Sequence, residues 1–213
     1  MRHAGTVCRW ISELSFADTV TALRRALPVT FANTQPNPSP TQGFQPDQPP
    51  KVKTLNEDKD SFGRLRQMLG APAVTDYLSI PTDVAQRFEI QRWQIFNLTA
   101  DTHPMHFHLV NVTIRTREQW AFNPDGTPAL PLRAIPGTAR AADANEQGWK
   151  ETVRMNPGEV VTVDMKFDLP KGMPPPPSPR LQASYGIRGA EYVWHCYILE
   201  HEEHDMMHAL VVI

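Results

Sequence analysis

The chain has 213 residues, enough for one large domain or a domain with an extension, since domains commonly hold roughly 100–200 residues. Its formal net charge of −2, from 21 Lys and Arg against 23 Asp and Glu, provides no basic surface for nucleic acid and no polybasic patch for a membrane. We therefore expect no nucleic-acid partner and no membrane partner.

The first twenty residues, MRHAGTVCRWISELSFADTV, contain no readable export signal. Arg9, Glu13 and Asp18 interrupt the apolar centre that such a signal needs. No apolar run in the chain approaches the roughly 20 residues of a membrane helix. The sequence therefore predicts a soluble chain of unknown location. Cys8 and Cys196 do not make a disulfide framework, so the redox compartment also stays open.

Residues 1–52 predict a short helix followed by an extension. The stretch SFADTVTALRRAL, from Ser15 to Leu27, starts with a capping residue, carries apolar side chains at helical spacing and is followed by Pro28. The next residues, up to Lys51, are rich in Pro, Asn, Gln and Thr, and such a composition buries too little apolar surface to offset the entropy of ordering. We interpret residues 1–52 as a helix plus a Pro-rich linker or extension that adds little to the core.

Residues 53–213 carry short runs in which apolar and polar residues alternate. The runs are FEIQRWQIFNL (88–98), HFHLVNVTIRT (106–116), KETVRMNPGEVVTVDMKFDL (150–169), EYVWHCYI (191–198) and HALVVI (208–213). Alternation with β-branched and aromatic enrichment, broken by turn motifs such as NPDG and NPG, is typical of an antiparallel sandwich or barrel. We therefore expect one all-β domain here, with a stiff loop at 174–177 and a mobile loop at 136–148.

Histidines gather in two short segments of this domain. Seven of the eight are His103, His106 and His108 in HPMHFH, and His195, His201, His204 and His208 near the C-terminus. In a strand that begins near His106, the side chains of His106 and His108 point to one face, whereas His103, next to Pro104, can turn elsewhere. One segment can therefore serve two separate sites.

The stretch VWHCYILEHEEHDMM places Cys196 between His195 and Tyr197. Strand alternation puts His195 and Tyr197 on one face and Cys196 on the other. A thiolate, two imidazoles and a distant thioether are the donor set of a blue copper site. Cys196, His201 and Met206 are spaced to supply three of these donors locally. The first histidine of HPMHFH would complete the set.

Other interpretations exist for each residue taken singly. A lone strand histidine is more often a hydrogen-bonded core or surface residue than a ligand, and a lone buried cysteine is usually a small apolar residue. Structural zinc sites normally draw on several cysteines, and only one is available in this segment. The acidic residues around His201 fit a solvated turn equally well. The joint pattern of sulfur and imidazole donors favours copper.

The segments HPMHFHLVNV, GWKETV, NPGEVV and VWHCYILEHEEHDMM together resemble the C-terminal cupredoxin domain of multicopper oxidases, in particular bacterial laccases of the spore-coat type and bilirubin oxidases. The resemblance covers residues 53–213 and implies a cupredoxin-like Greek-key β-sandwich. It further implies four ligands for a type 1 copper, which are His103, Cys196, His201 and Met206. Substrate electrons would enter at this copper and pass to a trinuclear copper cluster, where dioxygen becomes water.

The same resemblance assigns roles on the opposite face of the strands. His106, His108 and His195 match ligands of the type 2 and type 3 coppers, and Glu202 matches an acidic position that helps to deliver protons. Tyr197 departs from the family, which has a second histidine there. A phenol with a pKa of about 10 is a poor substitute for a neutral imidazole unless copper removes its proton. One type 3 ligand is therefore missing or replaced.

A second departure concerns the rest of the cluster. The family takes half of the trinuclear ligands from an N-terminal cupredoxin domain, and residues 1–52 contain a single histidine, His3. On this interpretation the chain alone does not build the cluster. It is a fragment, a domain that assembles with a second cupredoxin domain or in a homo-oligomer, or a single-domain descendant that keeps type 1 copper alone.

Three functions follow from these patterns. The leading one is a copper-binding domain of a laccase-like oxidoreductase, which takes electrons from a small phenol-type donor at the edge of His201 and uses dioxygen only if a partner domain completes the cluster. The second is a single-domain type 1 copper electron carrier, and the third is a copper-binding or storage module. By the resemblance, a periplasmic or extracellular location is compatible with all three. Loops 133–148 and 171–180 carry no recognisable signature of the reducing substrate.

Overall fold

The structure is a computed structural model that describes residues 46, 49–70, 73–171 and 177–213. The chain divides into two compact units, Met1–Asn37 and Pro38–Ile213, and all structural statements below concern the described part of the second unit. The helix expected from Ser15 to Leu27 lies outside the described residues, as do most of the Pro-rich segment and most of the 174–177 loop. Within the described part, no helix is long and apolar enough to cross a membrane.

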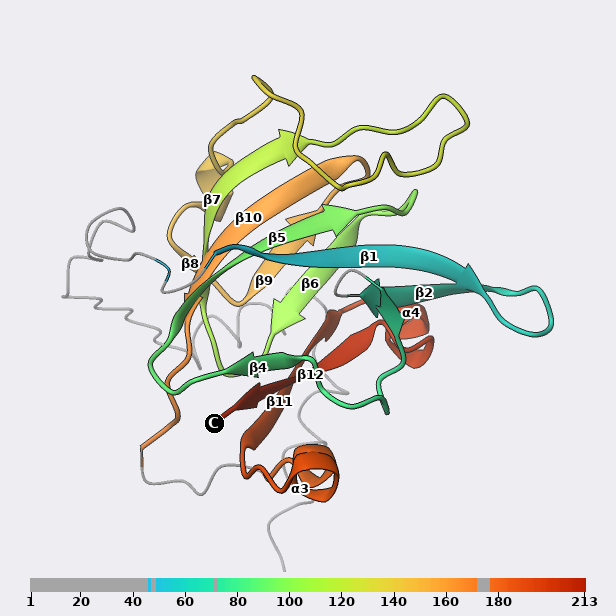
Figure 1. Ribbon diagram of the computed structural model, residues 1–213. Helices are drawn as coiled ribbons and strands as arrows, with labels where there is room; N and C mark the ends of the chain where they lie inside the picture. The colour runs from blue at the N-terminus through green and yellow to red at the C-terminus, as the bar shows by residue number, and fades with distance from the viewer. Residues whose placement is uncertain (1–45, 47–48, 71–72, 172–176) are drawn as a thin grey trace, which may run out of the picture. The chain divides into compact units, whose positions relative to one another are not determined.

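Two β-sheets form the described domain (Figure 1). The seven-stranded sheet has the order β3 (Val74–Thr75), β2 (Leu65–Gly70), β1 (Lys51–Lys59), β5 (Ile90–Asn97), β10 (Glu159–Lys166), β7 (Val112–Gln119) and β8 (Trp149–Lys150). The five-stranded sheet has the order β4 (Asp83–Ala85), β12 (Met207–Val212), β11 (Ala190–Cys196), β6 (His103–Phe107) and β9 (Thr152–Met155). Short helices η1 (Ala144–Glu146), α3 (Pro179–Tyr185) and α4 (Leu199–Glu203) occur in the connections. The predicted all-β sandwich is confirmed.

The main apolar core contains side chains from both sheets. Trp93 of β5 packs edge-on against Trp194 of β11, with ring centroids 5.4 Å apart, and Trp194 stacks on Phe107 of β6 at 6.1 Å. All three rings are buried, together with Cys196 and Met206. Since each fully buried large apolar side chain stabilises a fold by roughly 1.5–3 kcal/mol, this layer holds the two sheets together.

Several strands differ from the sequence prediction. The runs 88–98, 191–198 and 208–213 correspond closely to β5, β11 and β12, but the run 106–116 is wrong as a single strand. β6 already begins at His103 and ends at Phe107, and β7 begins at Val112 in the other sheet. Leu109, with a φ of 72°, lies in the break. Alternation continues across such a break and therefore does not reveal it.

The sandwich is also not purely antiparallel. β1 runs parallel to β5, and β12 runs parallel to β4, whereas the other named strand pairs are antiparallel. The expectation of an antiparallel sandwich is therefore wrong for these two pairs. A period of two residues reports which face of a strand is buried and carries no information about the direction of its neighbour.

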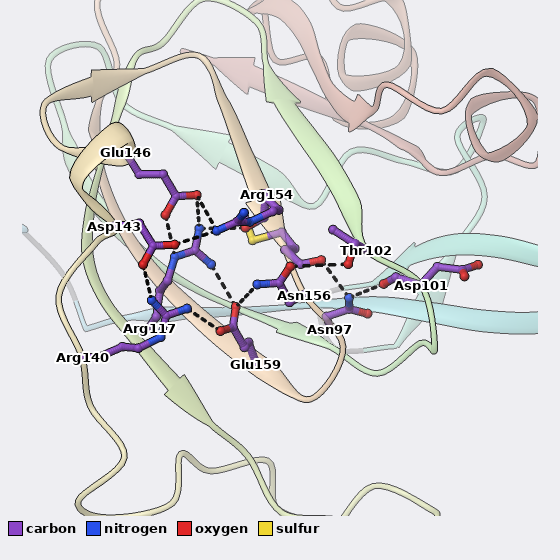
Figure 2. Close-up of polar contacts among 11 residues, drawn as sticks. Asn97, Asp101, Thr102, Arg117, Arg140, Asp143, Glu146, Arg154, Asn156 and Glu159 are labelled. Carbon is purple, nitrogen blue, oxygen red and sulfur yellow. Dashed lines mark hydrogen bonds and ion pairs between the residues drawn. The ribbon is translucent and has the colours of Figure 1, made fainter.

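The loop 136–148, which the sequence predicts to be mobile, is held by hydrogen bonds to β7 (Figure 2). Arg117 of β7 is fully buried and donates two hydrogen bonds to Glu146 of η1, at 2.6 and 2.9 Å. It also donates to Glu159 at 3.0 Å, and its backbone exchanges two hydrogen bonds with Arg140. The sequence shows a polar loop here, whereas the structure shows acidic side chains that satisfy a buried guanidinium.

A second buried ion pair connects the two sheets. Lys53 of β1 pairs with Asp83 of β4, and the side chains are 3% and 0% exposed. Trp194 of β11 donates its indole N–H to Asp83 at 2.9 Å, and the Lys53 ammonium lies 4.7 Å from the ring centroid of Trp93. The charges are therefore paired at the point where β1, β4 and β11 approach one another.

Candidate metal centres

The pairing of β6 with β11 brings the two histidine segments together. His195 lies opposite His106, and Cys196 lies opposite Met105. Residues directly opposite one another share a face of a sheet, so the imidazoles of His106 and His195 lie on one side and the thiol of Cys196 lies on the core side. His103 has the same parity as Met105 and therefore also faces the core. The two segments thus contribute to two clusters on opposite faces.

Helix α4 returns the chain over Cys196. The strand β11 ends at Cys196, α4 follows directly, and β12 then runs back antiparallel to β11. The turn is closed by backbone hydrogen bonds from Met206 N to His201 O at 3.0 Å and from Cys196 N to Met206 O at 3.1 Å. Met206 is fully buried in the same core cluster as Cys196, whereas His201 is partly exposed.

The first cluster consists of His103, Cys196 and His201. The Sγ atom of Cys196 lies 3.7 Å from Nδ1 of His103 and 3.8 Å from Nδ1 of His201, and the two Nδ1 atoms are 3.1 Å apart. For a zinc-sized ion with three ligands at about 120°, bond lengths of about 2.0–2.1 Å to nitrogen and 2.3 Å to sulfur separate the donors by about 3.5–3.8 Å. The two sulfur–nitrogen distances match this range, and the nitrogen–nitrogen distance of 3.1 Å is shorter by about 0.4 Å, so a small shift of one imidazole would let one metal ion reach all three donors. Their chemistry fits copper.

Burial keeps these donors uncharged. Burial lowers the pKa of His103 to about 4, and the nearby His201 imidazole contributes further to the lowering. Burial likewise lowers the pKa of His201 and raises the pKa of the Cys196 thiol to about 11, although the backbone N–H of Ile198 acts in the opposite direction on the thiol. At neutral pH the site thus presents two neutral imidazoles and a thiol whose proton a metal cation can replace.

The second cluster consists of His106, His108 and His195, whose ligand atoms all lie within 4.8 Å of one another. The Nε2 atoms of His108 and His195 are 3.2 Å apart. Nδ1 of His106 lies 3.0 Å from the hydroxyl of Thr152, and Nδ1 of His195 lies 2.9 Å from the carbonyl oxygen of Cys196. Burial, with a smaller contribution from neighbouring imidazoles, lowers the pKa of His106 and of His108. In His106 and His195 the Nε2 atom is therefore left for a ligand.

Tyr197 and Glu202 lie beside this second cluster. The ring of Tyr197 stacks on His106 with centroids 4.6 Å apart and an angle of 28° between the planes, and its side chain is 53% exposed. The Oε2 atom of Glu202 lies 3.6 Å from Nδ1 of His195. Tyr197 thus occupies the edge of the imidazole group, and Glu202 is within reach of it.

The remaining C-terminal histidines lie outside both clusters. His208 is buried, and its ring nitrogens lie 3.3 Å from the hydroxyl of Thr75 and 3.0 Å from that of Thr82. Two residues that contact the clusters were not identified from the sequence, namely Thr152 beside His106 and Thr99, whose hydroxyl lies 2.6 Å from Nε2 of His103. The polar NLTADT segment directly before HPMHFH was the available signal for Thr99.

Comparisons with known proteins identify the family of the chain. A family model described as multicopper oxidase matches residues 43–213. A laccase from Bacillus stratosphericus is 31% identical over 163 residues, which are 76% of this chain and 28% of that protein. A laccase from Bacillus subtilis (strain 168) is 33% identical over 118 residues, which are 54% of this chain and 18% of that protein. The chain therefore spans less than a third of the length of these relatives.

A solved structure shows the same fold. The structure titled as a multicopper oxidase from Campylobacter jejuni, a metallo-oxidase, superposes with a TM-score of 0.51 at 18% sequence identity. The superposition covers 79% of this chain and 31% of that protein. The two-sheet sandwich thus has the architecture of a cupredoxin domain.

Proposed function

Because the chain belongs to the multicopper oxidase family, we propose that it accepts single electrons from phenol-type donors at a type 1 copper. The proposed ligands are His103, Cys196, His201 and Met206. The observation that supports this best is the triangle of one buried sulfur and two imidazole nitrogens at 3.1–3.8 Å. Copper bound there would supply a one-electron acceptor, and the surrounding residues determine how a donor reaches it.

The donor would approach through His201. His103 and Cys196 are fully buried, whereas His201 is partly exposed on α4. Burial lowers the pKa of His201, and three nearby carboxylates act in the opposite direction, namely those of Asp101, Glu200 and Glu57. The partly exposed side of His201 therefore has carboxylates near it. His201 would thus hold the metal with Nδ1 and present the rest of its ring to a small molecule.

The second cluster would bind a metal less tightly. His106 and His195 present Nε2 atoms fixed by hydrogen bonds on Nδ1, but His108 is exposed, and the phenol of Tyr197 takes the place of a fourth imidazole. Three neutral imidazoles can hold copper or zinc with an open position. Glu202, whose Oε2 atom lies 3.6 Å from Nδ1 of His195, is placed to help deliver protons to this face. Dioxygen reduction here would require the remaining ligands from a partner domain or another copy of the chain.

Tyr197 also favours a second candidate function, a type 1 copper electron carrier that does not reduce dioxygen. The phenol stacks on His106 and so covers one side of the imidazole group. A carrier would accept and return one electron at the first cluster and would use the second face little.

Copper reconstitution separates these functions. The purified chain would be loaded with copper, its copper stoichiometry and visible and electron paramagnetic spectra measured, and oxygen uptake followed with a phenolic donor. A blue protein that the donor bleaches reversibly supports the type 1 site, and oxygen uptake supports the oxidase over the carrier. A copper-loaded chain that stays colourless would overturn the type 1 proposal and leave copper storage as the function.

A further inference from the structure

The ring nitrogen of His103 that faces away from Cys196 is hydrogen bonded inside the protein. Nε2 of His103 lies 2.6 Å from the hydroxyl of Thr99, and the same hydroxyl lies 2.8 Å from Oδ1 of Asn97. His103 and Asn97 are fully buried, and Thr99 is 4% exposed. Asn97 ends β5 and His103 begins β6, so this chain of hydrogen bonds spans the connection between the two sheets.

The partners of Asn97 fix the orientation of its amide. Its Nδ2 group donates to the carbonyl oxygens of Asp101 at 2.7 Å and Met155 at 3.0 Å. Both partners are acceptors, so the atom that faces Thr99 is the carbonyl oxygen Oδ1. The backbone N–H of Thr99 also donates to this oxygen, at 3.0 Å. Figure 2 shows the Asn97 side chain between the 101–102 segment and the turn at Asn156.

The direction of the next two hydrogen bonds follows from proton counting. The Thr99 hydroxyl has one proton. Besides His103, its partners are two acceptors, Oδ1 of Asn97 at 2.8 Å and the carbonyl oxygen of Asp101 at 3.3 Å, and one donor, the backbone N–H of Asp101 at 3.2 Å. The single hydroxyl proton is directed to the two acceptors, so the hydroxyl oxygen accepts from His103 as well as from the Asp101 N–H. The proton of the neutral imidazole is then on Nε2, and the lone pair on Nδ1 points toward Cys196 and His201.

We propose that Asn97 and Thr99 are positioning residues that hold His103 as the Nε2–H tautomer, with Nδ1 free for copper. The statement that Nδ1 serves copper rests on the proposed function. The statement that Asn97 and Thr99 fix the tautomer of His103 does not depend on it. Hydrogen-bond partners of a metal-bound histidine fix its tautomer and ring orientation, and their removal commonly lowers metal affinity about 10–100-fold. Neither residue touches the metal position, so both act through His103.

Their anchorage in the fold gives the arrangement rigidity. Asn97 donates to Met155 at the end of β9, and the next residue, Asn156, donates to Glu159 at 2.9 Å. Glu159 in turn accepts from the buried Arg117 at 3.0 Å. Figure 2 shows these residues as one connected group. The position of the His103 ring is thereby connected to a buried ion-pair network in the opposite sheet.

The first test uses the metal-free protein. Nitrogen–proton correlation spectra of the imidazole groups report the tautomer of His103, and we expect Nε2–H in the wild type. Thr99→Val keeps the side-chain shape but removes the hydroxyl, so the His103 spectrum should show a mixture of the Nδ1–H and Nε2–H tautomers. Thr99→Ser retains a hydroxyl and should keep the Nε2–H tautomer alone. Thr102→Val is the matched control, because Thr102 is exposed and its hydroxyl lies 3.4 Å from Asn156. If Thr99→Val does not fold, Thr99→Ala gives the same readout.

The second test measures metal affinity by competition with a chelator. We expect copper(II) to bind Thr99→Val about 10–100-fold more weakly than wild type, with Thr99→Ser and Thr102→Val close to wild type. An Nδ1–H tautomer in the wild type, or affinity unchanged in Thr99→Val, would overturn the inference. A wild type with the expected tautomer but no blue copper species would instead overturn the proposed function and leave the role of Thr99 in fixing the tautomer in place.

Discussion

Single residues determine which metal the first cluster accepts. Burial lowers the pKa of His103 to about 4 and raises the pKa of Cys196 to about 11, so the site carries no charge before a metal binds. A metal cation replaces the thiol proton, and the resulting thiolate is the soft donor that distinguishes copper from harder ions. Cys196 is therefore the residue on which the identity of the site depends most.

Replacing Cys196 by Ser tests this dependence. The hydroxyl oxygen of serine is neither a thiolate nor a soft donor, so the Cys196→Ser protein should lose the blue colour that thiolate-to-copper charge transfer gives. Visible and electron paramagnetic spectra of the copper-loaded variant are the measurement. Met105→Leu is a suitable control, because Met105 lies opposite Cys196 in the neighbouring strand and is equally buried. A Cys196→Ser variant that stays blue would contradict the assignment.

Met206 should adjust the copper site without being essential to it. As a weak axial thioether it influences the reduction potential of a type 1 copper more than its colour. We therefore expect Met206→Leu to stay blue and to have a higher potential than wild type, as measured by redox titration of the visible band. Loss of the colour in this variant would show that Met206 has a different role from the one proposed.

Residue types and local spacing predicted the donors of the first cluster, whereas the grouping of His106, His108 and His195 came from the family resemblance. Strand alternation predicted that Cys196 and His195 face opposite sides of the sheet. The spacing of His201 and Met206 after Cys196 predicted that both lie in the turn that follows the strand. The contact between Thr99 and His103 could not be predicted, because it depends on the conformation of the loop that connects β5 with β6. Hydrogen bonds between side chains in a loop leave no periodic pattern in a sequence.

At the level of secondary-structure elements, the strands with strong alternation were predictable and the polar ones were not. β5, β11 and β12 were found close to their expected bounds because each places large apolar residues in the core. The strand β1, KVKTLNEDK, was missed since seven of its nine residues are polar or charged and only its centre is buried. Its burial depends on the ion pair between Lys53 and Asp83, which the sequence does not reveal.

The buried Arg117 should contribute strongly to the stability of the seven-stranded sheet. Arg117→Met removes the bidentate partner of Glu146, whose remaining cation Arg154 lies 3.7 Å away, while Glu159 keeps its ion pair with Arg140. Because the Glu146 carboxylate is left poorly compensated, the variant should lose about 3–5 kcal/mol of unfolding free energy. Urea denaturation of the metal-free protein measures this loss. Arg64→Met, in the exposed hairpin between β1 and β2, should leave the urea midpoint unchanged. Equal effects of the two substitutions would contradict the importance given to burial.

The pair between Lys53 and Asp83 allows a double-mutant cycle. Lys53→Met leaves a fully buried carboxylate without its cation and should destabilise the protein by about 3–5 kcal/mol. Combining it with Asp83→Asn removes the charge but keeps an acceptor for the indole N–H of Trp194, so most of that loss should be recovered. Urea denaturation of the four proteins gives the coupling energy. If the double variant is less stable than Lys53→Met, the main contribution of Asp83 is not its charge pair with Lys53.

At the scale of the whole molecule, the two clusters are adjacent but differ in completeness. His195 and Cys196 are consecutive, and Nδ1 of His195 lies 2.9 Å from the carbonyl oxygen of Cys196, so the backbone of β11 connects the two faces directly. The first cluster is buried except for the partly exposed His201, and it draws all its proposed ligands from the described residues. The second is more exposed, and Tyr197 stacks against it at the position where the family resemblance implies a histidine. The proposed electron acceptance therefore needs only ligands that this chain supplies, whereas dioxygen reduction would need further ligands.

Oxygen uptake by the isolated chain tests this difference. The three imidazoles of the second face provide less than half of a trinuclear centre by the family resemblance, so a copper-loaded monomer should show little or no four-electron reduction of dioxygen with a phenolic donor. Tyr197→His adds one imidazole but not the ligands of a second domain, and it should not restore turnover by itself. The measurement is oxygen consumption by monomer of defined copper content, with and without Tyr197→His.

The outcomes of that experiment separate three arrangements of the second face. Robust turnover by the wild-type monomer would show that His106, His108 and His195 form a competent centre with Tyr197 in place, which contradicts the prediction. Turnover confined to an oligomer would indicate that ligands are shared between chains. By the family resemblance, the N-terminal cupredoxin domain carries two His-x-His pairs. Turnover that appears when a chain with two such pairs is added would support assembly with a second cupredoxin domain, because such a chain supplies the nitrogen donors that this face lacks.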